Sequence, residues 1–161
     1  MSGAYIHETS IVSNESIIGK GSKIWHFSHI RENVSIGKNV TVGQNVYIDK
    51  NVSIGDNCKI QNNVSIYDGV TLKNNIFVGP SVVFTNDKYP DAMHWDDNLK
   101  LKTLINESVS IGANSTILPG IEIGKGTLIG AGSVVTKSFD ENLVIYGNPA
   151  IIIKKRWVNL Y

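Results

Sequence analysis

Aliphatic residues recur at every sixth position along most of this chain. Fourteen consecutive steps from Ile6 to Phe84 are apolar, and thirteen of them are Ile, Val or Leu. Six further steps run from Ile105 to Val135. A helix repeats near 3.6 residues and a simple strand repeats at 2, so neither produces a period of six. A short strand followed by a turn does, and three such units close one coil of a solenoid in about 18 residues.

The residues around the repeated position support strands and tight turns. A small or β-branched residue precedes it by two in most steps, and Gly often follows it. Val and Ile favour strands, whereas Gly tolerates the positive φ of tight turns. The repeat therefore predicts an all-β, parallel β-helix whose large aliphatic side chains point inward and whose coils stack about 4.8 Å apart. A length of 161 residues favours a single domain over 1–161.

The repeat is interrupted once. From Phe84 to Ile105 the chain takes 21 residues where six would suffice, so about 15 residues are extruded as a loop over about 85–104. A loop of this length in a small domain is usually functional or disordered, and the aromatic Tyr89 and Trp95 argue against disorder. After Val135 the register changes, and we expect residues of about 137–161 to form a short cap over the open end of the solenoid.

Composition excludes several classes of protein. Fifteen Lys and Arg against fourteen Asp and Glu give a net charge of +1, which disfavours a nucleic-acid partner. A single Cys, Cys58, excludes an intrachain disulfide framework and is expected to be structural. No apolar run approaches the roughly 20 residues that span a bilayer, and residues 1–10 contain no signal-peptide pattern. We therefore expect a cytoplasmic protein with no membrane partner.

The 18-residue coil predicts which polar residues stack. One column contains Glu32, Lys50, Asp68 and Asn86, and the adjacent column contains Arg31, Asp49, Tyr67 and Thr85. Asn86 is expected one coil, about 4.8 Å, from Asp68, at the point where the loop leaves. A solvated turn with alternating charges is the alternative interpretation, and the adjoining loop favours a functional site.

A column of small residues is predicted at another corner. With 15 residues extruded, Gly79 stacks on Gly112 and Gly130, and Pro80 stacks on Ala113 and Ala131. Such a column either leaves a shallow groove with accessible backbone groups or simply reflects the preference for Gly at tight corners.

The repeat, which extends from Ile6 to about Trp157, resembles the hexapeptide-repeat acyltransferase superfamily, as does the ending Gly147-Asn148-Pro149-Ala150. This resemblance implies a left-handed β-helix that uses acetyl-CoA as cosubstrate. It implies that the pantetheine arm lies in a groove, here at Gly112, Ala113, Gly130, Ala131 and Pro149. Lys154 and Lys155 would then meet the phosphates of the coenzyme, and a solubilising tail is the alternative.

Three stretches resemble a subgroup that N-acetylates nucleotide-linked 3-amino sugars for bacterial surface polysaccharides. They are Lys23-Ile24-Trp25-His26-Phe27-Ser28-His29-Ile30, the stretch from Gln61 to Val70, and the stretch from Val78 to Asn86. The resemblance implies a homotrimer with active sites between subunits and places Asn86 near the sugar amine. The substrate-binding residues it implies are Arg31, Glu32, Asn62, Tyr67, Asp87 and Tyr89.

Two branches of this subgroup differ in their acceptor. One acts on a dTDP-linked 3-amino-3,6-dideoxyhexose and the other on a UDP-linked 3-amino glucuronate. The sequence has no Arg between Ile60 and Trp95, whereas a sugar carboxylate favours a bidentate Arg. This favours the uncharged deoxyhexose, with Arg31 or Lys88 left as alternative partners for a carboxylate. Nothing distinguishes a gluco from a galacto acceptor.

The expected chemistry is direct attack of the C3 amine on the thioester. An amide is not a base at neutral pH, so Asn86 would orient the amine, and Asp68 could hydrogen-bond it. Catalysis would depend mainly on positioning, with backbone N–H groups stabilising the oxyanion. His26 of a neighbouring chain is the fallback general base.

Three other interpretations compete. A zinc enzyme of the γ-carbonic anhydrase type needs three His ligands, and His26 and His29 lack a third on an adjacent coil, since His7 lies in a different phase. No metal is therefore expected. A non-catalytic solenoid scaffold is disfavoured by the loop and by the chain's ending. An acyltransferase for another acceptor, such as a 4-amino sugar, differs only in the matched stretches.

Overall fold

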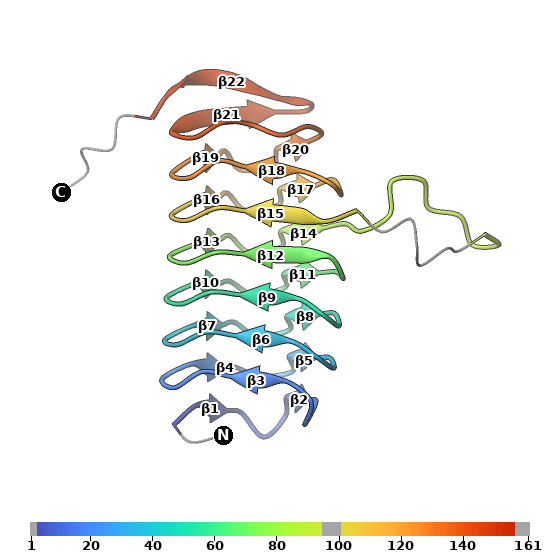
Figure 1. Cartoon of the computed structure of the whole chain (residues 1–161), viewed down its shortest axis with the longest axis vertical. Helices are drawn as coiled ribbons and strands as arrows, with labels where there is room; N and C mark the ends of the chain where they lie inside the picture. The colour runs from blue at the N-terminus through green and yellow to red at the C-terminus, as the bar shows by residue number, and fades with distance from the viewer. Residues whose placement is uncertain (1–2, 95–100, 157–161) are drawn as a thin grey trace.

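The computed structural model describes residues 3–94 and 101–156 of the chain. Within these ranges the chain forms short strands and no helix, so none there is long and apolar enough to cross a membrane. The strands stack into a column with the N-terminus at one end and β21 and β22 at the other (Figure 1). Residues 95–100 of the predicted loop and 157–161 of the predicted cap, Trp95 and Trp157 among them, lie outside the described residues.

Three sheets form the sides of the solenoid. Sheet A contains, in spatial order, β1 (Tyr5–Ile6), β4 (Lys23–Ile24), β7 (Thr41–Val42), β10 (Lys59–Ile60), β13 (Phe77–Val78), β16 (Ser110–Ile111), β19 (Leu128–Ile129), β21 (Leu143–Gly147) and β22 (Ala150–Lys155). Sheet B contains β2 (Ile11–Val12), β5 (His29–Ile30), β8 (Tyr47–Ile48), β11 (Ser65–Ile66), β14 (Val83–Phe84), β17 (Thr116–Ile117) and β20 (Val134–Val135). Sheet C contains β18 (Glu122–Ile123), β15 (Thr103–Ile105), β12 (Val70–Leu72), β9 (Ser53–Ile54), β6 (Ser35–Ile36) and β3 (Ile17–Ile18).

The register confirms the predicted coil. Before the loop, each strand pairs in parallel with the strand 18 residues later, as Ile48 does with Ile66. Across the loop, Phe84 pairs with Ile117, 33 residues later, so the loop inserts 15 residues. The predicted parallel β-helix of hexapeptide repeats is therefore confirmed, and its architecture is consistent with the left-handed form.

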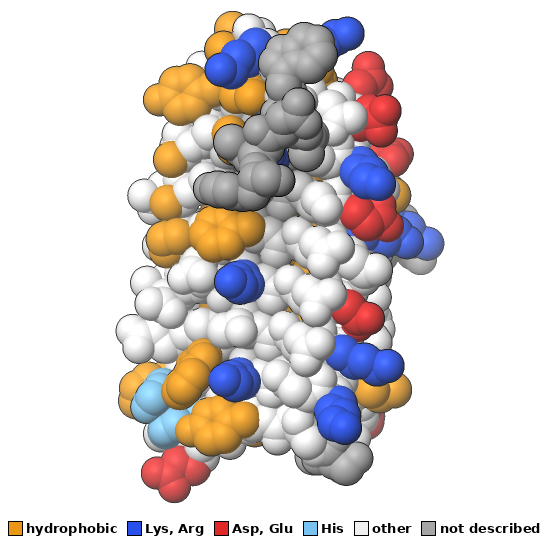
Figure 2. All heavy atoms as spheres, turned by 90° about the vertical axis from the view of Figure 1, so that its left-hand side faces the viewer, with side chains coloured by type: hydrophobic (Ala, Val, Ile, Leu, Met, Phe, Trp, Pro, Cys, Tyr) orange, Lys and Arg blue, Asp and Glu red, His pale blue; other side chains and the backbone are white. Residues whose placement is uncertain are grey.

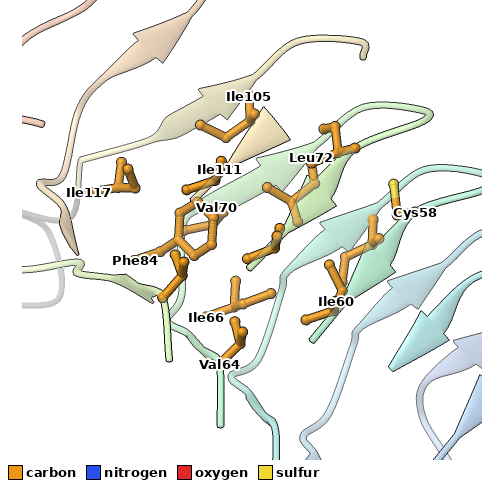
Figure 3. Packing of buried hydrophobic residues seen from close by; sticks show 14 of the residues in the cluster. Cys58, Ile60, Val64, Ile66, Val70, Leu72, Phe84, Ile105, Ile111 and Ile117 are labelled. Carbon is orange, nitrogen blue, oxygen red and sulfur yellow. The ribbon is translucent and has the colours of Figure 1, made fainter. Parts of the chain in front are cut away.

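The repeated aliphatic residues fill the interior, and Figure 3 shows them converging from the three sheets. Ile60, Ile66, Leu72 and Phe84 are each 0 to 1% exposed. Burying one such side chain contributes about 1.5–3 kcal/mol, and the repeat provides one at every sixth residue. The continuous core along the axis holds successive corners in fixed register, which positions the polar groups at those corners.

The small residues of the repeat are buried as well, and several of them satisfy backbone groups. The Ser22 hydroxyl donates to the Gly37 carbonyl at 2.8 Å and accepts from the Val40 N–H at 2.9 Å. Ser28 does the same with the Gly43 carbonyl and the Val46 N–H. A hydroxyl therefore ties each of these corners to the next coil.

Asn dominates the third turn position because the backbone there has positive φ. Asn45, Asn63 and Asn114 have φ of 54°, 61° and 57°. Asn adopts this left-handed conformation more readily than other residues with a side chain, because its short polar group bonds locally. The Asn45 side-chain amide also donates to the Asn63 carbonyl oxygen at 2.9 Å, which begins a ladder along the corner.

The C-terminal cap covers one side of the solenoid. Strand β22 folds back antiparallel on β21 and extends sheet A, with Ala150 buried against the core. Sheets B and C end at β20 and β18, where Phe139 adds a single bridge to Ile123. Ile151, Ile152 and Ile153 remain more than half exposed on β22.

Candidate active site

The predicted site residues divide between two corners of the solenoid. We call the turns between sheets B and C the B/C corner, which includes residues 31–34, 49–52, 67–69 and the start of the loop. The turns between sheets A and B form the A/B corner, with residues 25–28, 43–46, 61–64, 79–82, 112–115 and 130–133. Sheet B separates the two corners within one chain.

The B/C corner brings together most residues predicted to bind the acceptor. Tyr67 follows β11, and the β11–β14 register carries Asn86 to the position one coil beyond Asp68, as predicted. Asp68 is only 7% exposed, and Asn86 is half-buried. A buried carboxylate and an amide therefore lie at the base of the loop.

An ion-pair cluster occupies the same corner. Arg31 Nη2 lies 2.7 Å from Glu32 Oε1, and Arg31 Nε donates to Glu32 Oε2 at 3.1 Å. Arg31 Nη1 lies 3.0 Å from Asp49 Oδ1 on the next coil. The Tyr47 hydroxyl and the Glu32 carboxylate raise the pKa of the guanidinium. The pKa of Glu32 is lowered, chiefly by its own backbone N–H and further by Arg31.

Asp49 joins three coils, which sequence reasoning did not predict. Its Oδ1 accepts from the Tyr47 hydroxyl at 3.2 Å and from the Lys50 N–H at 2.8 Å. Its Oδ2 accepts from the Asp68 N–H at 3.3 Å. Asp49 is 8% exposed, so this carboxylate is fixed from several sides. Its place in the Arg31 column was the available signal.

An aromatic ladder borders the cluster. The His29 and Tyr47 rings lie 5.8 Å apart between centroids, and Tyr47 lies 5.5 Å from Tyr67. Burial raises the pKa of the Tyr47 hydroxyl. Tyr67 was predicted to bind substrate, whereas Tyr47 was missed. The signal for Tyr47 is its outward position on β8, two residues before Asp49.

The loop leaves and re-enters the solenoid at the B/C corner. The Thr85 hydroxyl donates to the Ile117 carbonyl at 3.1 Å, and the Thr103 N–H donates to the Gly69 carbonyl at 2.9 Å on the return. The Asp87 carboxylate accepts from the Tyr89 N–H at 2.8 Å, which forms a local turn. Tyr89 is 79% exposed and projects with the loop away from the solenoid (Figure 1).

The A/B corner carries an aromatic cluster at the N-terminal end. The His7 and His26 rings are 3.5 Å apart between centroids, and Trp25 lies 5.4 Å from Tyr5. Figure 2 shows histidine and hydrophobic side chains gathered there. The contact of His7 with His26 corrects the expectation that His7 is isolated, because the planar rings reach across the turn despite their different phase. Within residues 3–94 and 101–156, no group of three or more His, Cys, Asp or Glu could hold a metal ion.

Asn62, at the same corner, has a structural partner. Its side-chain oxygen accepts from the Gln44 N–H at 3.0 Å. Asp56 and Asn74 do the same at the corner between sheets C and A, for the N–H groups of Lys38 and Asp56. A role in substrate binding for Asn62 stays a prediction.

The small-residue column stacks as predicted. The Asn114 N–H donates to the Pro80 carbonyl at 2.9 Å, and the Gly132 N–H donates to the Ala113 carbonyl at 2.8 Å. A Cβ on Gly112 would overlap the backbone of Ala131, and a Cβ on Gly130 would overlap the ring of Tyr146. Close packing therefore explains these glycines, and Gly19, Gly37 and Gly55 show the same crowding at the corner between sheets C and A.

The predicted phosphate-binding residues lie at the two ends of β22. Pro149 precedes Ala150 beside the A/B corner, where Ala150 pairs with Gly147. Lys154 and Lys155 pair with Val144 and Leu143 at the opposite end of sheet A and are exposed. Four strand residues separate them from Ala150, roughly 13 Å, so only an extended ligand could contact both ends.

An open cavity of about 660 Å³ lies near the C-terminal end of the solenoid. Its lining includes Glu122, Lys125, Lys137, Glu141 and Ile152. None of the predicted site residues lines it.

Comparison with known proteins identifies the repeat. The family model described as bacterial transferase hexapeptide (six repeats) matches residues 15–50, 51–86 and 102–137. A model described as a hexapeptide repeat of succinyl-transferase matches residues 33–68. A galactoside O-acetyltransferase of Lactococcus lactis is 39% identical over 71 residues, which cover 44% of this chain and 34% of that protein. The chain thus matches about a third of the length of this curated relative.

Two solved structures resemble the fold. A point mutant of GDP-perosamine N-acetyltransferase from Caulobacter crescentus, in complex with CoA and GDP-perosamine, has a TM-score of 0.60 and 20% identity, covering 93% of this chain and 56% of that one. A point mutant of AntD, an N-acyltransferase from Bacillus cereus in complex with dTDP and coenzyme A, has a TM-score of 0.58 and 22% identity, covering 97% and 83%. The family model matches more than half of the chain, so the chain belongs to the bacterial transferase hexapeptide family.

Proposed function

We propose that the chain N-acetylates the C3 amine of a nucleotide-linked sugar, with acetyl-CoA as the acetyl donor and dTDP-3-amino-3,6-dideoxyhexose as the preferred acceptor. The observation that carries this proposal is the B/C corner. There the inserted loop starts at Asn86, one coil from the buried Asp68 and beside the Arg31 cluster. Within the family, the AntD structure with dTDP and coenzyme A supports this class of substrate. The product would serve surface polysaccharide synthesis.

The roles of the B/C corner residues follow from their chemistry. The Asn86 side-chain oxygen would accept a hydrogen bond from the sugar amine and aim its lone pair at the thioester carbonyl. Asp68 would accept a second hydrogen bond from the amine or from a neighbouring sugar hydroxyl. Neither interaction needs a change of protonation in Asn86, so the corner would accelerate the reaction by positioning. Tyr67, Asp87 and Tyr89 would contact the nucleotide and the sugar.

The A/B corner offers space for the thioester arm. Ala113 and Ala131 present only methyl groups there, and the α-carbon of Gly132 has open space around it. A narrow chain can therefore approach the backbone at this corner. Acetyl-CoA would supply the activated acetyl group, and Gly112, Ala113, Gly130 and Ala131 would border its arm, with Pro149, Lys154 and Lys155 beyond them.

Sheet B separates the two corners, so one chain alone would hold the acceptor and the donor apart. We propose a homotrimer in which the B/C corner of one subunit faces the A/B corner of the next. His26 could then reach the acceptor amine only from a neighbouring chain, where an imidazole could take the amine proton.

Release of free thiol from acetyl-CoA tests the proposal. The acceptors are dTDP-3-amino-3,6-dideoxyglucose, its galacto epimer, and UDP-2-acetamido-3-amino-2,3-dideoxyglucuronate. Faster turnover of a dTDP sugar supports the proposal. Turnover of the glucuronate alone would retain the activity and overturn the acceptor. No turnover of any of the three would refute the proposed function and favour another acceptor or a scaffold.

A further inference from the structure

Arg31 is the guanidinium at the B/C corner, and its N–H groups are already engaged. Two of its nitrogens face the two oxygens of Glu32, which is the bidentate geometry that Arg uses to recognise carboxylates. A third nitrogen donates to Asp49. The side of Arg31 best suited to grip a carboxylate on a substrate is therefore filled by the protein's own carboxylate.

Asp49 keeps this arrangement in place. Four donors converge on its carboxylate: the Arg31 guanidinium, the Tyr47 hydroxyl and the backbone N–H groups of Lys50 and Asp68. The carboxylate is nearly buried, so it cannot swing away to release Arg31 without leaving these donors unpaired. Glu32 is more exposed, at 34% of its side chain, and is the more easily displaced of the two.

The charges at the corner act in the same direction. Glu32, Asp49 and Asp68 carry three negative charges, against two positive charges on Arg31 and Lys50. A sugar carboxylate entering the corner would meet this negative excess and would have to compete with Glu32 for Arg31. A sugar amine in its ammonium form would be attracted, and a methyl group at C6 would be indifferent to the charges.

We propose that Glu32 and Asp49 determine acceptor specificity by occupying Arg31, so that the corner excludes 3-amino sugars that carry a carboxylate. Asp49 acts as the positioning residue and Glu32 as the group that fills the guanidinium fork. This inference rests on the proposed function, which it deepens by naming what selects the acceptor.

The test compares two acceptors that share one nucleotide. They are dTDP-3-amino-3,6-dideoxyglucose and the corresponding dTDP-3-amino-3-deoxyglucuronate, which differ in the group at C6. For the wild-type protein we expect kcat/KM to favour the uncharged acceptor by about 100-fold or more. Glu32→Gln keeps the shape of the side chain and removes its charge. We expect it to reduce this preference about tenfold or more, chiefly through a lower KM for the acidic acceptor.

Control variants separate the inference from general electrostatics and from misfolding. Glu107→Gln removes a carboxylate at a different corner and should leave the preference unchanged. Asp49→Asn should also weaken the preference, and circular dichroism shows whether each variant is folded. Higher salt should narrow the wild-type preference, since charge repulsion is screened.

The outcomes are distinguishable. If the wild type acetylates the uncharged acceptor and folded Glu32→Gln leaves the preference unchanged, the inference is wrong and the proposed function stands. Wild-type preference for the acidic acceptor would also overturn the inference. If the wild type acetylates neither sugar, the proposed function fails, and the inference fails with it.

Discussion

Two glycines of the A/B corner allow a direct test of how the solenoid is packed. A Cβ added to Gly112 would lie 2.7 Å from Ala131 Cα and closer still to Ala131 N, where ordinary contact begins at 3.4 Å. The obstacle is backbone of the next coil, so the coils must separate locally by about 1 Å. Overpacking of this kind costs about 1–3 kcal/mol, and we expect Gly112→Ala to lose about 3 kcal/mol.

Gly132 provides the matched control. Its φ is +70°, and nothing lies within 4 Å of an added Cβ. Gly132→Ala should therefore lose only about 1 kcal/mol, from the strain of the left-handed conformation. The equivalent position one coil earlier is Asn114, with φ 57°. Gly132→Asn should consequently be within about 0.5 kcal/mol of the wild type, because Asn tolerates this conformation.

Urea unfolding followed by circular dichroism measures all three variants, at one fixed protein concentration because association changes apparent stability. The expected order of midpoints places Gly132→Asn near the wild type, Gly132→Ala slightly lower and Gly112→Ala lowest. A Gly112→Ala protein as stable as the wild type would refute the packing argument. So would a Gly132→Asn protein that loses as much as Gly112→Ala.

Three further predictions concern the core, the loop base and the corner charges. Ile66→Ala should cost about 2–5 kcal/mol in urea unfolding because Ile66 is 0% exposed, whereas Ser65→Ala, one position outward, should change little; equal losses would contradict the inward orientation. Asn86→Ala should lower kcat/KM for the amino sugar about 100-fold by misplacing the amine, while Asn74→Ala, at another corner, should not; unaltered kinetics of Asn86→Ala would argue against positioning. The pKa of Glu32 is lowered from 4.5 in the folded chain, so its stabilisation is present above this value and lost as the pH falls through the lowered pKa. The difference in urea midpoint between the wild type and Glu32→Gln should therefore shrink in acid, and a constant difference would exclude this linkage.

The fold could be predicted because one period sets strand, turn and stacking together. The 15-residue insertion followed from the step between Phe84 and Ile105, and the pairing of Phe84 with Ile117 confirms it. The same register correctly predicted that Gly79 stacks on Gly112 and that Asn86 follows Asp68. Backbone position follows from counting because every coil has the same length.

Side-chain contacts were less predictable, since they depend on reach and direction as well as phase. Arg31 and Asp49 were assigned to one column, but the donors that converge on Asp49 come from three coils and include the Tyr47 hydroxyl. His7 meets His26 through ring size, which a phase count ignores. Lys154 lies away from the A/B corner because β22 reverses direction, and a repeat cannot predict a reversal.

The most direct test of the proposed N-acetylation changes a single atom of the acceptor. Thiol release from acetyl-CoA is measured with dTDP-3-amino-3,6-dideoxyglucose and with the same nucleotide sugar carrying a hydroxyl at C3. Our account predicts turnover of the amino sugar, with the acetyl group on its nitrogen, and little or none of the hydroxy sugar. Equal or faster turnover of the hydroxy sugar would contradict the account and would indicate an O-acetyltransferase.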